Sequence, residues 1–313
     1  MGAAITLPSW PALAQEIDSP GDPLPIQLVT NLFTRVAAAA VIDGRGPFSF
    51  VIDTGAGSTS ISDTLAGQLG LRSLPPMVVH GITEARVTPC VAIGRLRLSG
   101  LGFRNLACPV FPREQLGADG LLGLDVLGRF KLRFDVARRA ASLTMPGISI
   151  TMGGETRLGT RLPQGMRSAR NRFGQMILTQ VVADGQPVAA FIDSGAQYSI
   201  GNRALARAVT ARRPVGRRTA RPVPVYGVTG ESLTADLLQI DDLRLGSSRL
   251  GATPLLFADL HCFKTLKLAD RPALLIGADL LGRFREVTMD FPSSSVGFVG
   301  LRRQIRPPVD LRG

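Results

Sequence analysis

The sequence predicts an all-β fold of two similar β-barrel lobes related by a pseudo-two-fold axis, with a few short helices. Three observations predict it. Short alternating strands punctuated by glycine and proline dominate the chain. The two halves repeat the same motifs in the same order. The length of 313 residues lets each half bury its own core.

The first repeated block reads strand, turn, strand, acid, turn. It occurs as AVIDGRGPFSFVIDTGAGSTSIS at residues 40–62 and as QVVADGQPVAAFIDSGAQYSIGN at residues 180–202. In both copies an apolar strand leads directly into an aspartate, Asp53 or Asp193. An Asp-Gly pair between the two apolar runs of each copy is a strong signal for a β-hairpin.

The second repeated block is GLLGLDVLGRF at residues 120–130 and LLIGADLLGRF at residues 274–284. We expect a short helix in each, with Asp125 and Asp279 as N-caps. Two further short helices are expected at residues 62–70 and 202–210.

These repeats predict the domain organisation. A first lobe is expected at residues 26–145, a linker rich in turn residues at 146–170, and a second lobe at 171–302. Residues 1–14 are small and apolar and end in Ala-Leu-Ala, which suits signal-peptide cleavage. We therefore expect an exported protein, periplasmic or secreted. The chain has no apolar run of 18 residues, so stable membrane insertion is not expected.

The formal net charge is +12, and nearly all the positive charge is arginine. The arginines are scattered, and the chain has too few aromatic residues to alternate with them as stacking platforms. We therefore expect a solvated basic surface and no nucleic-acid partner. The three cysteines, Cys90, Cys108 and Cys262, form neither a disulfide framework nor a zinc motif. Cys90 and Cys108 flank an expected hairpin, so they are either a pair or two buried thiols.

The two aspartates suggest paired acid–base chemistry. A carboxylate after an apolar strand needs hydrogen-bond donors or a neighbour that shares its proton. If the halves pack about a pseudo-two-fold axis, Asp53 and Asp193 face each other and together hold one proton. The ionised member can then take a proton from water, and the protonated member can hydrogen-bond a peptide carbonyl.

The duplicated D-[TS]-G-A motif and the later apolar-apolar-Gly blocks resemble the retropepsin-like aspartic proteases, particularly bacterial members. The resemblance covers residues 30–140 and 172–300. It implies catalytic aspartates at Asp53 and Asp193. The supporting loop residues that it implies are Thr54, Gly55, Ser194 and Gly195. The blocks around Gly123 and Gly277 would brace these loops.

The resemblance further implies flaps at the glycine-centred turns, with His80, Gly81, Tyr226 and Gly227 contacting substrate. The expected activity is that of an aspartic endopeptidase acting on extended peptides, without metal or cofactor. Both units lie in one chain, so a monomer would suffice. Pepsin-like enzymes have Ser or Thr after the motif's glycine, where this chain has alanine. We therefore expect a dyad that titrates higher than pepsin's, and activity at mildly acidic to neutral pH.

One alternative stays open. A protein with the same fold that is latent or catalytically inactive would bind peptides or serve as a scaffold, because folds outlast their chemistry. The two histidines, His80 and His261, lack the context of a catalytic triad or a zinc site, which favours ordinary surface or flap residues.

Overall fold

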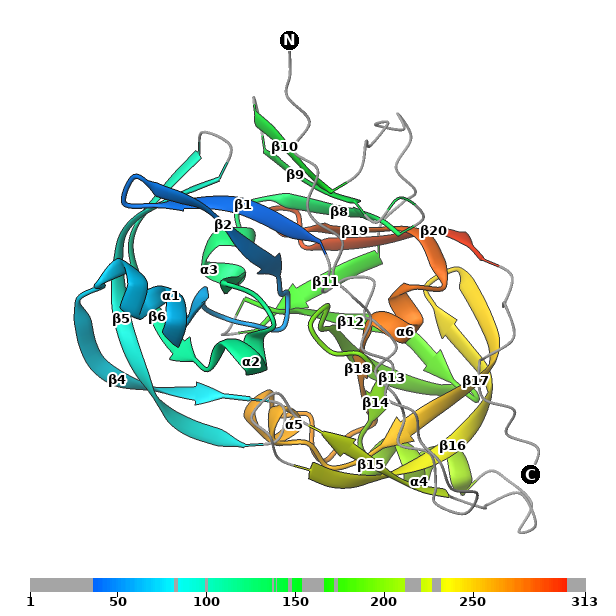
Figure 1. The fold of residues 1–313 in the computed structure, drawn as a ribbon. Helices are drawn as coiled ribbons and strands as arrows, with labels where there is room; N and C mark the ends of the chain where they lie inside the picture. Colours follow the sequence, from blue (N-terminus) through cyan, green and yellow to red (C-terminus); the bar gives the residue numbers. More distant parts are fainter. Residues whose placement is uncertain are drawn as a thin grey trace, which may run out of the picture.

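In a computed structural model the chain forms two β-barrels that share a third sheet (Figure 1). The structure describes residues 36–302 except 82–83, 99–100, 137, 139, 146–147, 154–165, 172–173, 212–220 and 227–231. The expected signal segment and Gly227 lie outside the described residues. The predicted all-β, two-lobed fold is confirmed.

The first lobe is a barrel closed by six strands. Their order around the barrel is β1-β2-β7-β3-β6-β5, and β5 pairs back to β1. A further strand, β4, extends β5 as a long hairpin. The bounds are β1 Ala37–Ile42, β2 Arg45–Ile52, β3 Ser60–Ser62, β4 Ser73–His80, β5 Ala85–Leu98, β6 Leu101–Phe111 and β7 Gly120–Leu122.

The second lobe repeats this arrangement strand for strand. The order β12-β13-β18-β14-β17-β16 closes through pairing of β16 with β12, and β15 extends β16. The bounds are β12 Met176–Ala183, β13 Gln186–Ile192, β14 Ile200–Gly201, β15 Arg221–Tyr226, β16 Ser232–Leu245, β17 Ser248–Phe257 and β18 Ala273–Ile276. The internal repeat of the sequence is therefore a repeat of topology.

A third sheet joins the two lobes, in the order β10-β9-β8-β19-β20-β11. Its central pairing is between the halves, because β8 pairs with β19 along five residues. The bounds are β8 Lys131–Asp135, β9 Ala140–Met145, β10 Ile148–Gly153, β11 Met166–Arg170, β19 Phe284–Asp290 and β20 Ser295–Leu301. The interval expected as a linker thus contains two strands, β10 and β11, on either side of residues 154–165.

Short helices connect the strands. The helices expected at residues 62–70 and 202–210 are α1 and α4. Each begins after a side-chain N-cap: Ser62 accepts a hydrogen bond from Leu65 N–H, and Asn202 accepts one from Leu205 N–H. The bounds are α1 Asp63–Leu69, α2 Arg113–Leu116, α3 Leu124–Leu127, α4 Arg203–Thr210, α5 His261–Thr265 and α6 Ala278–Leu281. None of the helices in the described ranges is long and apolar enough to cross a membrane.

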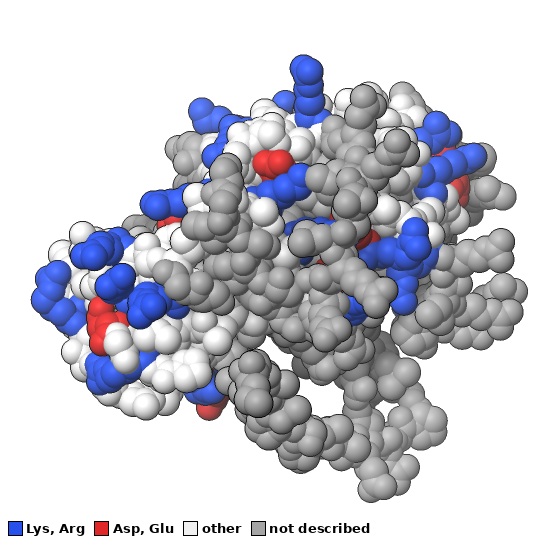
Figure 2. Space-filling model, turned by 90° about the horizontal axis from the view of Figure 1, so that it is seen from above, with Lys and Arg blue, Asp and Glu red and all other residues white. Residues whose placement is uncertain are grey.

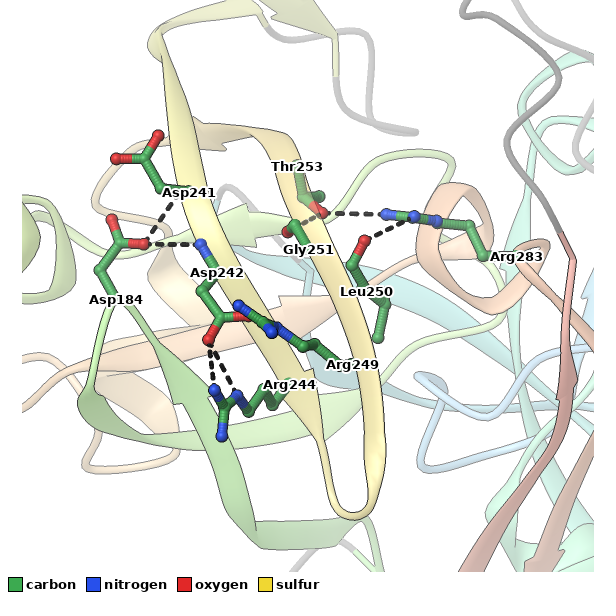
Figure 3. A network of polar contacts seen from close by, with 9 residues as sticks. All are labelled: Asp184, Asp241, Asp242, Arg244, Arg249, Leu250, Gly251, Thr253 and Arg283. Carbon is green, nitrogen blue, oxygen red and sulfur yellow. Dashed lines mark hydrogen bonds and ion pairs between the residues drawn. The ribbon is translucent and has the colours of Figure 1, made fainter.

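The predicted Asp-Gly hairpins also close the barrels. Asp43 and Asp184 both adopt positive φ, as a two-residue hairpin turn requires. The Asp43 carboxylate accepts the Arg95 N–H at 2.7 Å, and Asp184 accepts the Asp241 and Asp242 N–H groups at 2.8 and 2.9 Å (Figure 3). Each turn therefore fastens its hairpin to the strand that completes the barrel.

The same region of the second lobe is held by arginines (Figure 3). Asp242 accepts hydrogen bonds from Arg244 and Arg249, at 2.9 and 2.7 Å. Arg283, just after α6, donates to the Thr253 hydroxyl at 2.9 Å and to the Leu250 carbonyl at 2.8 Å. Arg283 thus ties the second copy of the later repeated block, at residues 274–284, to β17.

Basic side chains lie in several separate groups over the face shown in Figure 2, with acidic groups between them. The cysteines Cys90, Cys108 and Cys262 are free, and the first two are buried. Of the two readings of Cys90 and Cys108, the structure thus supports buried thiols.

Candidate active site

Both sequence-predicted aspartates follow directly from the end of a strand that has a parallel neighbour. Asp53 follows β2, and its N–H donates to the Leu122 carbonyl of β7 at 3.0 Å. Asp193 follows β13, and its N–H donates to the Ile276 carbonyl of β18 at 3.0 Å. The barrel strands thus fix where each carboxylate begins.

Reciprocal hydrogen bonds between the lobes join the two loops. Thr54 N–H donates to the Ser194 hydroxyl oxygen at 3.1 Å, and Ser194 N–H donates to the Thr54 hydroxyl oxygen at 3.0 Å. The two hydroxyl groups also lie 3.2 Å apart. Both side chains are buried, so no water competes for these bonds. The loops of two separate barrels are therefore held as one unit.

The glycines of the two motifs permit the close approach of the carboxylates. A Cβ added to Gly55 would fall inside the Asp193 carboxylate, closer than real Cβ atoms occur. A Cβ on Gly195 would lie 2.9 Å from the Asp53 carboxylate oxygens. Each glycine thus lies against the aspartate of the other lobe.

Backbone donors orient both carboxylates. Gly55 N–H and Ala56 N–H donate to Asp53 Oδ1 at 2.9 and 3.2 Å. Asp193 Oδ1 accepts in the same way from the two residues that follow Ser194, at 2.9 and 3.1 Å. The two halves of the site therefore match bond for bond.

The electrostatics of the pair favour proton sharing. Burial raises the pKa of Asp53 above the ordinary carboxyl range, partly offset by its two backbone donors. Burial, followed by the charge of Asp53, raises the pKa of Asp193 to about 7. One proton is therefore retained by the pair at a pH where isolated carboxyls are ionised.

The later glycine blocks pack under the two loops. A Cβ on Gly123 would collide with the backbone of Ser58, and one on Gly277 with the backbone of Tyr198. Their N–H groups donate to the hydroxyls of Thr59 at 3.1 Å and Ser199 at 2.9 Å. Only glycine fits where these blocks support the loops.

The prediction that Asp125 and Asp279 are N-caps is wrong. The N-cap positions belong to Gly123 and Gly277, and the aspartates lie in the first turns of α3 and α6. The reason is a stronger partner, because Asp125 accepts the Thr59 hydroxyl at 2.7 Å and Asp279 accepts the Ser199 hydroxyl at 2.6 Å. Asp125 and Asp279 therefore hold the ends of the loops that follow Asp53 and Asp193.

Sequence reasoning missed a support from the second lobe to the first loop. Gln175 Nε2 donates to the Gly55 carbonyl at 3.0 Å. Asn171 holds this amide, donating to Gln175 Oε1 at 3.0 Å and accepting the Gln175 N–H at 3.1 Å. The Gly55 carbonyl belongs to the peptide whose N–H, on Ala56, donates to Asp53. Gln175 therefore orients a donor of the dyad.

Replacing Gln175 with alanine is expected to lower kcat about 10-fold, because loss of one orienting bond misplaces the Asp53 loop while substrate contacts remain. KM should change little. The measurement is steady-state kinetics of Q175A beside Q186A, whose amide lies in the exposed Asp184-Gly185 hairpin. Equal kinetics for both variants would show that Gln175 does not position the dyad.

The residues expected at the flaps have different outcomes. His80 ends β4 and contacts His261, the first residue of α5 in the other lobe. Gly81 follows it, and its N–H donates to the Glu84 carbonyl at 2.8 Å in the hairpin turn. Tyr226 ends β15, with its backbone paired to Ser232. The partnership of His80 and His261 carried no local signal, because 181 residues separate them.

In the described part of the chain, no group of three or more His, Cys, Asp and Glu side chains is placed to hold a metal ion. Tyr198, which follows the second motif, is partly buried against the core of its lobe.

A family model described as "Aspartyl protease" matches residues 38–126 and 179–280, once in each lobe. The matches together span more than half of the chain, which therefore belongs to the aspartyl protease family. It contains two tandem units of that family.

Two solved structures are similar at low identity. A retropepsin-like aspartic protease from Rickettsia conorii has 14% identity and a TM-score of 0.32, over 47% of this chain and 99% of its own. Basic 7S globulin from soybean has 10% identity and a TM-score of 0.38, over 84% of this chain and 94% of its own. No curated protein has a significantly similar sequence.

Proposed function

We propose that this protein is an aspartic endopeptidase in which Asp53 and Asp193 form one catalytic dyad. The observation that carries the proposal is the symmetric joining of the two loops through Thr54 and Ser194. This joining sets one oriented carboxylate from each lobe against the other lobe's glycine. One chain supplies both halves, so a monomer suffices for one site.

The chemistry follows from the shared proton. The ionised aspartate accepts a proton from a water molecule as the water oxygen attacks the peptide carbonyl carbon. The protonated aspartate hydrogen-bonds the carbonyl oxygen, which takes up the electron pair of the C=O bond. The tetrahedral intermediate then collapses, the C–N bond breaks, and the nitrogen leaves with a proton from the dyad. The products are a carboxylic acid and an amine.

The β4–β5 hairpin supports an extended, apolar substrate. Val78 pairs with Val87 across the hairpin, and both side chains are exposed, by 56% and 67%. They share a hairpin face with His80, because side chains two residues apart point the same way. That face contacts α5 of the other lobe through His80. We therefore propose that these exposed valines make apolar contacts with substrate.

The test is cleavage of an unfolded protein from pH 3 to 8 by the wild type and by D53N and D193N. The proposal predicts cleavage by the wild type and a loss of at least about 10³-fold in each variant, since either substitution removes acid–base catalysis. D63N is the control, because Asp63 lies exposed at the start of α1. It should cleave as the wild type does.

Two outcomes would contradict the proposal. Cleavage retained in D53N or D193N would show that the two lobes do not share one site. Binding of the unfolded protein by the wild type and both variants, without cleavage by any of them, would support a peptide-binding protein of the same fold.

A further inference from the structure

The two lobes also meet at a pair formed by the only two histidines of the chain. His80 Nδ1 and His261 Nε2 lie 3.0 Å apart, and the ring planes differ by 7°. The centroids are 5.3 Å apart. An imidazole N–H lies in its ring plane, so a bond this short between parallel rings places them edge to edge. One nitrogen donates and the other accepts.

This hydrogen bond connects a hairpin of the first lobe to a helix beside the dyad. In Figure 1 the end of β4 reaches across to α5. Phe263 of α5 is buried in the core of the second lobe, so the helix is firmly held. Burial raises the pKa of the thiol of the neighbouring residue, Cys262, and the charge of Asp193 raises it further. The histidine pair therefore lies at the start of the helix whose next residue, Cys262, interacts electrostatically with Asp193.

The proton count of the pair decides whether the bond exists. With no added proton, or with one, an N–H of one ring faces the lone pair of the other. With both rings protonated, two N–H groups face each other and two positive charges repel. The contact is then lost. Histidine is the side chain that ordinarily gains a proton as the pH falls below neutral, so acidification is the change that brings the pair to this state.

Burial and nearby positive charge make a proton on His261 harder to bind. Burial, then His80, then Lys264 lower the pKa of His261. Lys264 lies on α5 itself. On the hairpin, Arg86 and Glu84 form an ion pair at 3.4 Å. Asp259, before α5, accepts the Arg203 N–H at 3.1 Å.

We propose that His80 and His261 form a pH-sensitive latch, which holds the β4–β5 hairpin over the site near neutral pH and releases it in acid. This inference rests on the proposed function, because the latch regulates access to the Asp53–Asp193 dyad. Release on acidification opens the site in the pH range where the dyad retains its shared proton.

Substitutions at His80 test the proton count directly. Asparagine places an amide near the position of Nδ1, and the amide can donate to or accept from His261, so H80N should stay latched at every pH. Aspartate places a carboxylate there, which binds protonated His261 more strongly than neutral His261. H80D should therefore reverse the pH dependence and latch more firmly in acid.

The readout is the distance between spin labels on the hairpin and on the second lobe. Cysteines replace the exposed residues Val87 and Lys267, and C262A removes the remaining accessible thiol. In the labelled chain that keeps both histidines, the distance between the labels should shift from mainly short at pH 8 to mainly long at pH 5. The open fraction should rise about 10-fold. H80N should keep the short distance at both values, and so also shows that the fold persists at pH 5.

The same shift in all three chains, or no shift in the chain with both histidines, would overturn the latch. The measurement does not depend on cleavage. A latch that opens, when the unlabelled wild type has no protease activity, would leave this inference standing and contradict the proposed function. An active dyad with a distance that ignores pH would do the reverse.

Discussion

Alanine in place of Gly55 is expected to lower kcat/KM for peptide hydrolysis at least about 100-fold, since misplacing a catalytic group by about 1 Å has effects of this size. The added methyl group would occupy the position of the Asp193 carboxylate. That carboxylate is 7% exposed and is held by two backbone donors, so it cannot move without loss of its bonds. Steady-state kinetics with a peptide substrate measures the effect.

Gly67 offers the matched control. It lies inside α1, and nothing lies within 4 Å of an added Cβ. G67A should leave hydrolysis unchanged and stabilise the chain by about 0.5–1 kcal/mol, because alanine is the better helix former. If G55A kept more than about a tenth of the wild-type kcat/KM, a close approach of the lobes at this glycine would not be needed for activity.

Asparagine in place of Asp193 is expected to increase the free energy of unfolding at neutral pH. The folded chain raises the pKa of Asp193 from 3.8 to about 7, so folding is penalised when this group is ionised. The penalty is absent below pH 4, grows between pH 4 and 7, and is constant above. The gain of D193N should follow the same course and reach at most on the order of 4 kcal/mol at pH 8. Urea unfolding at a series of pH values measures it.

Asp63 provides a control of opposite sign. The N–H groups of Thr64 and Arg113 lower the pKa of this exposed carboxyl. Its ionised form therefore favours folding above the ordinary carboxyl pKa, and this contribution is lost as the pH falls. D63N should be slightly less stable than the wild type at neutral pH and equal to it in acid. A stability difference for D193N that ignores pH would show that Asp193 carries no raised pKa.

Local patterns predicted the parts of the fold that local chemistry determines. The Asp-Gly turns, the capped helices α1 and α4, and the strands that end at the two aspartates depend on neighbouring residues. The duplication added the longer-range information, since two copies of D-[TS]-G-A imply two lobes that place equivalent groups together.

The remaining features depend on contacts between distant segments. The pairing of β8 with β19 joins halves that are 153 residues apart at the Arg133–Glu286 ion pair, and neither strand carries a signal for its partner. The local capping rule gave the wrong role for Asp125, because its carboxylate accepts the hydroxyl of the distant Thr59 instead. Gln175 stands before β12 without any motif. The roles of such residues can be assigned only from the contacts in the folded structure.

The central claim is that Asp53 and Asp193 share one proton, and carboxyl-carbon NMR of 13C-labelled aspartates tests it most directly. In the wild type, two signals should titrate in two linked steps, and both should disappear or shift in D53N and D193N. The charge of Asp53 helps raise the pKa of Asp193, so D53N should lower the pKa of Asp193. An Asp193 signal that titrates identically with and without Asp53 would contradict the shared dyad.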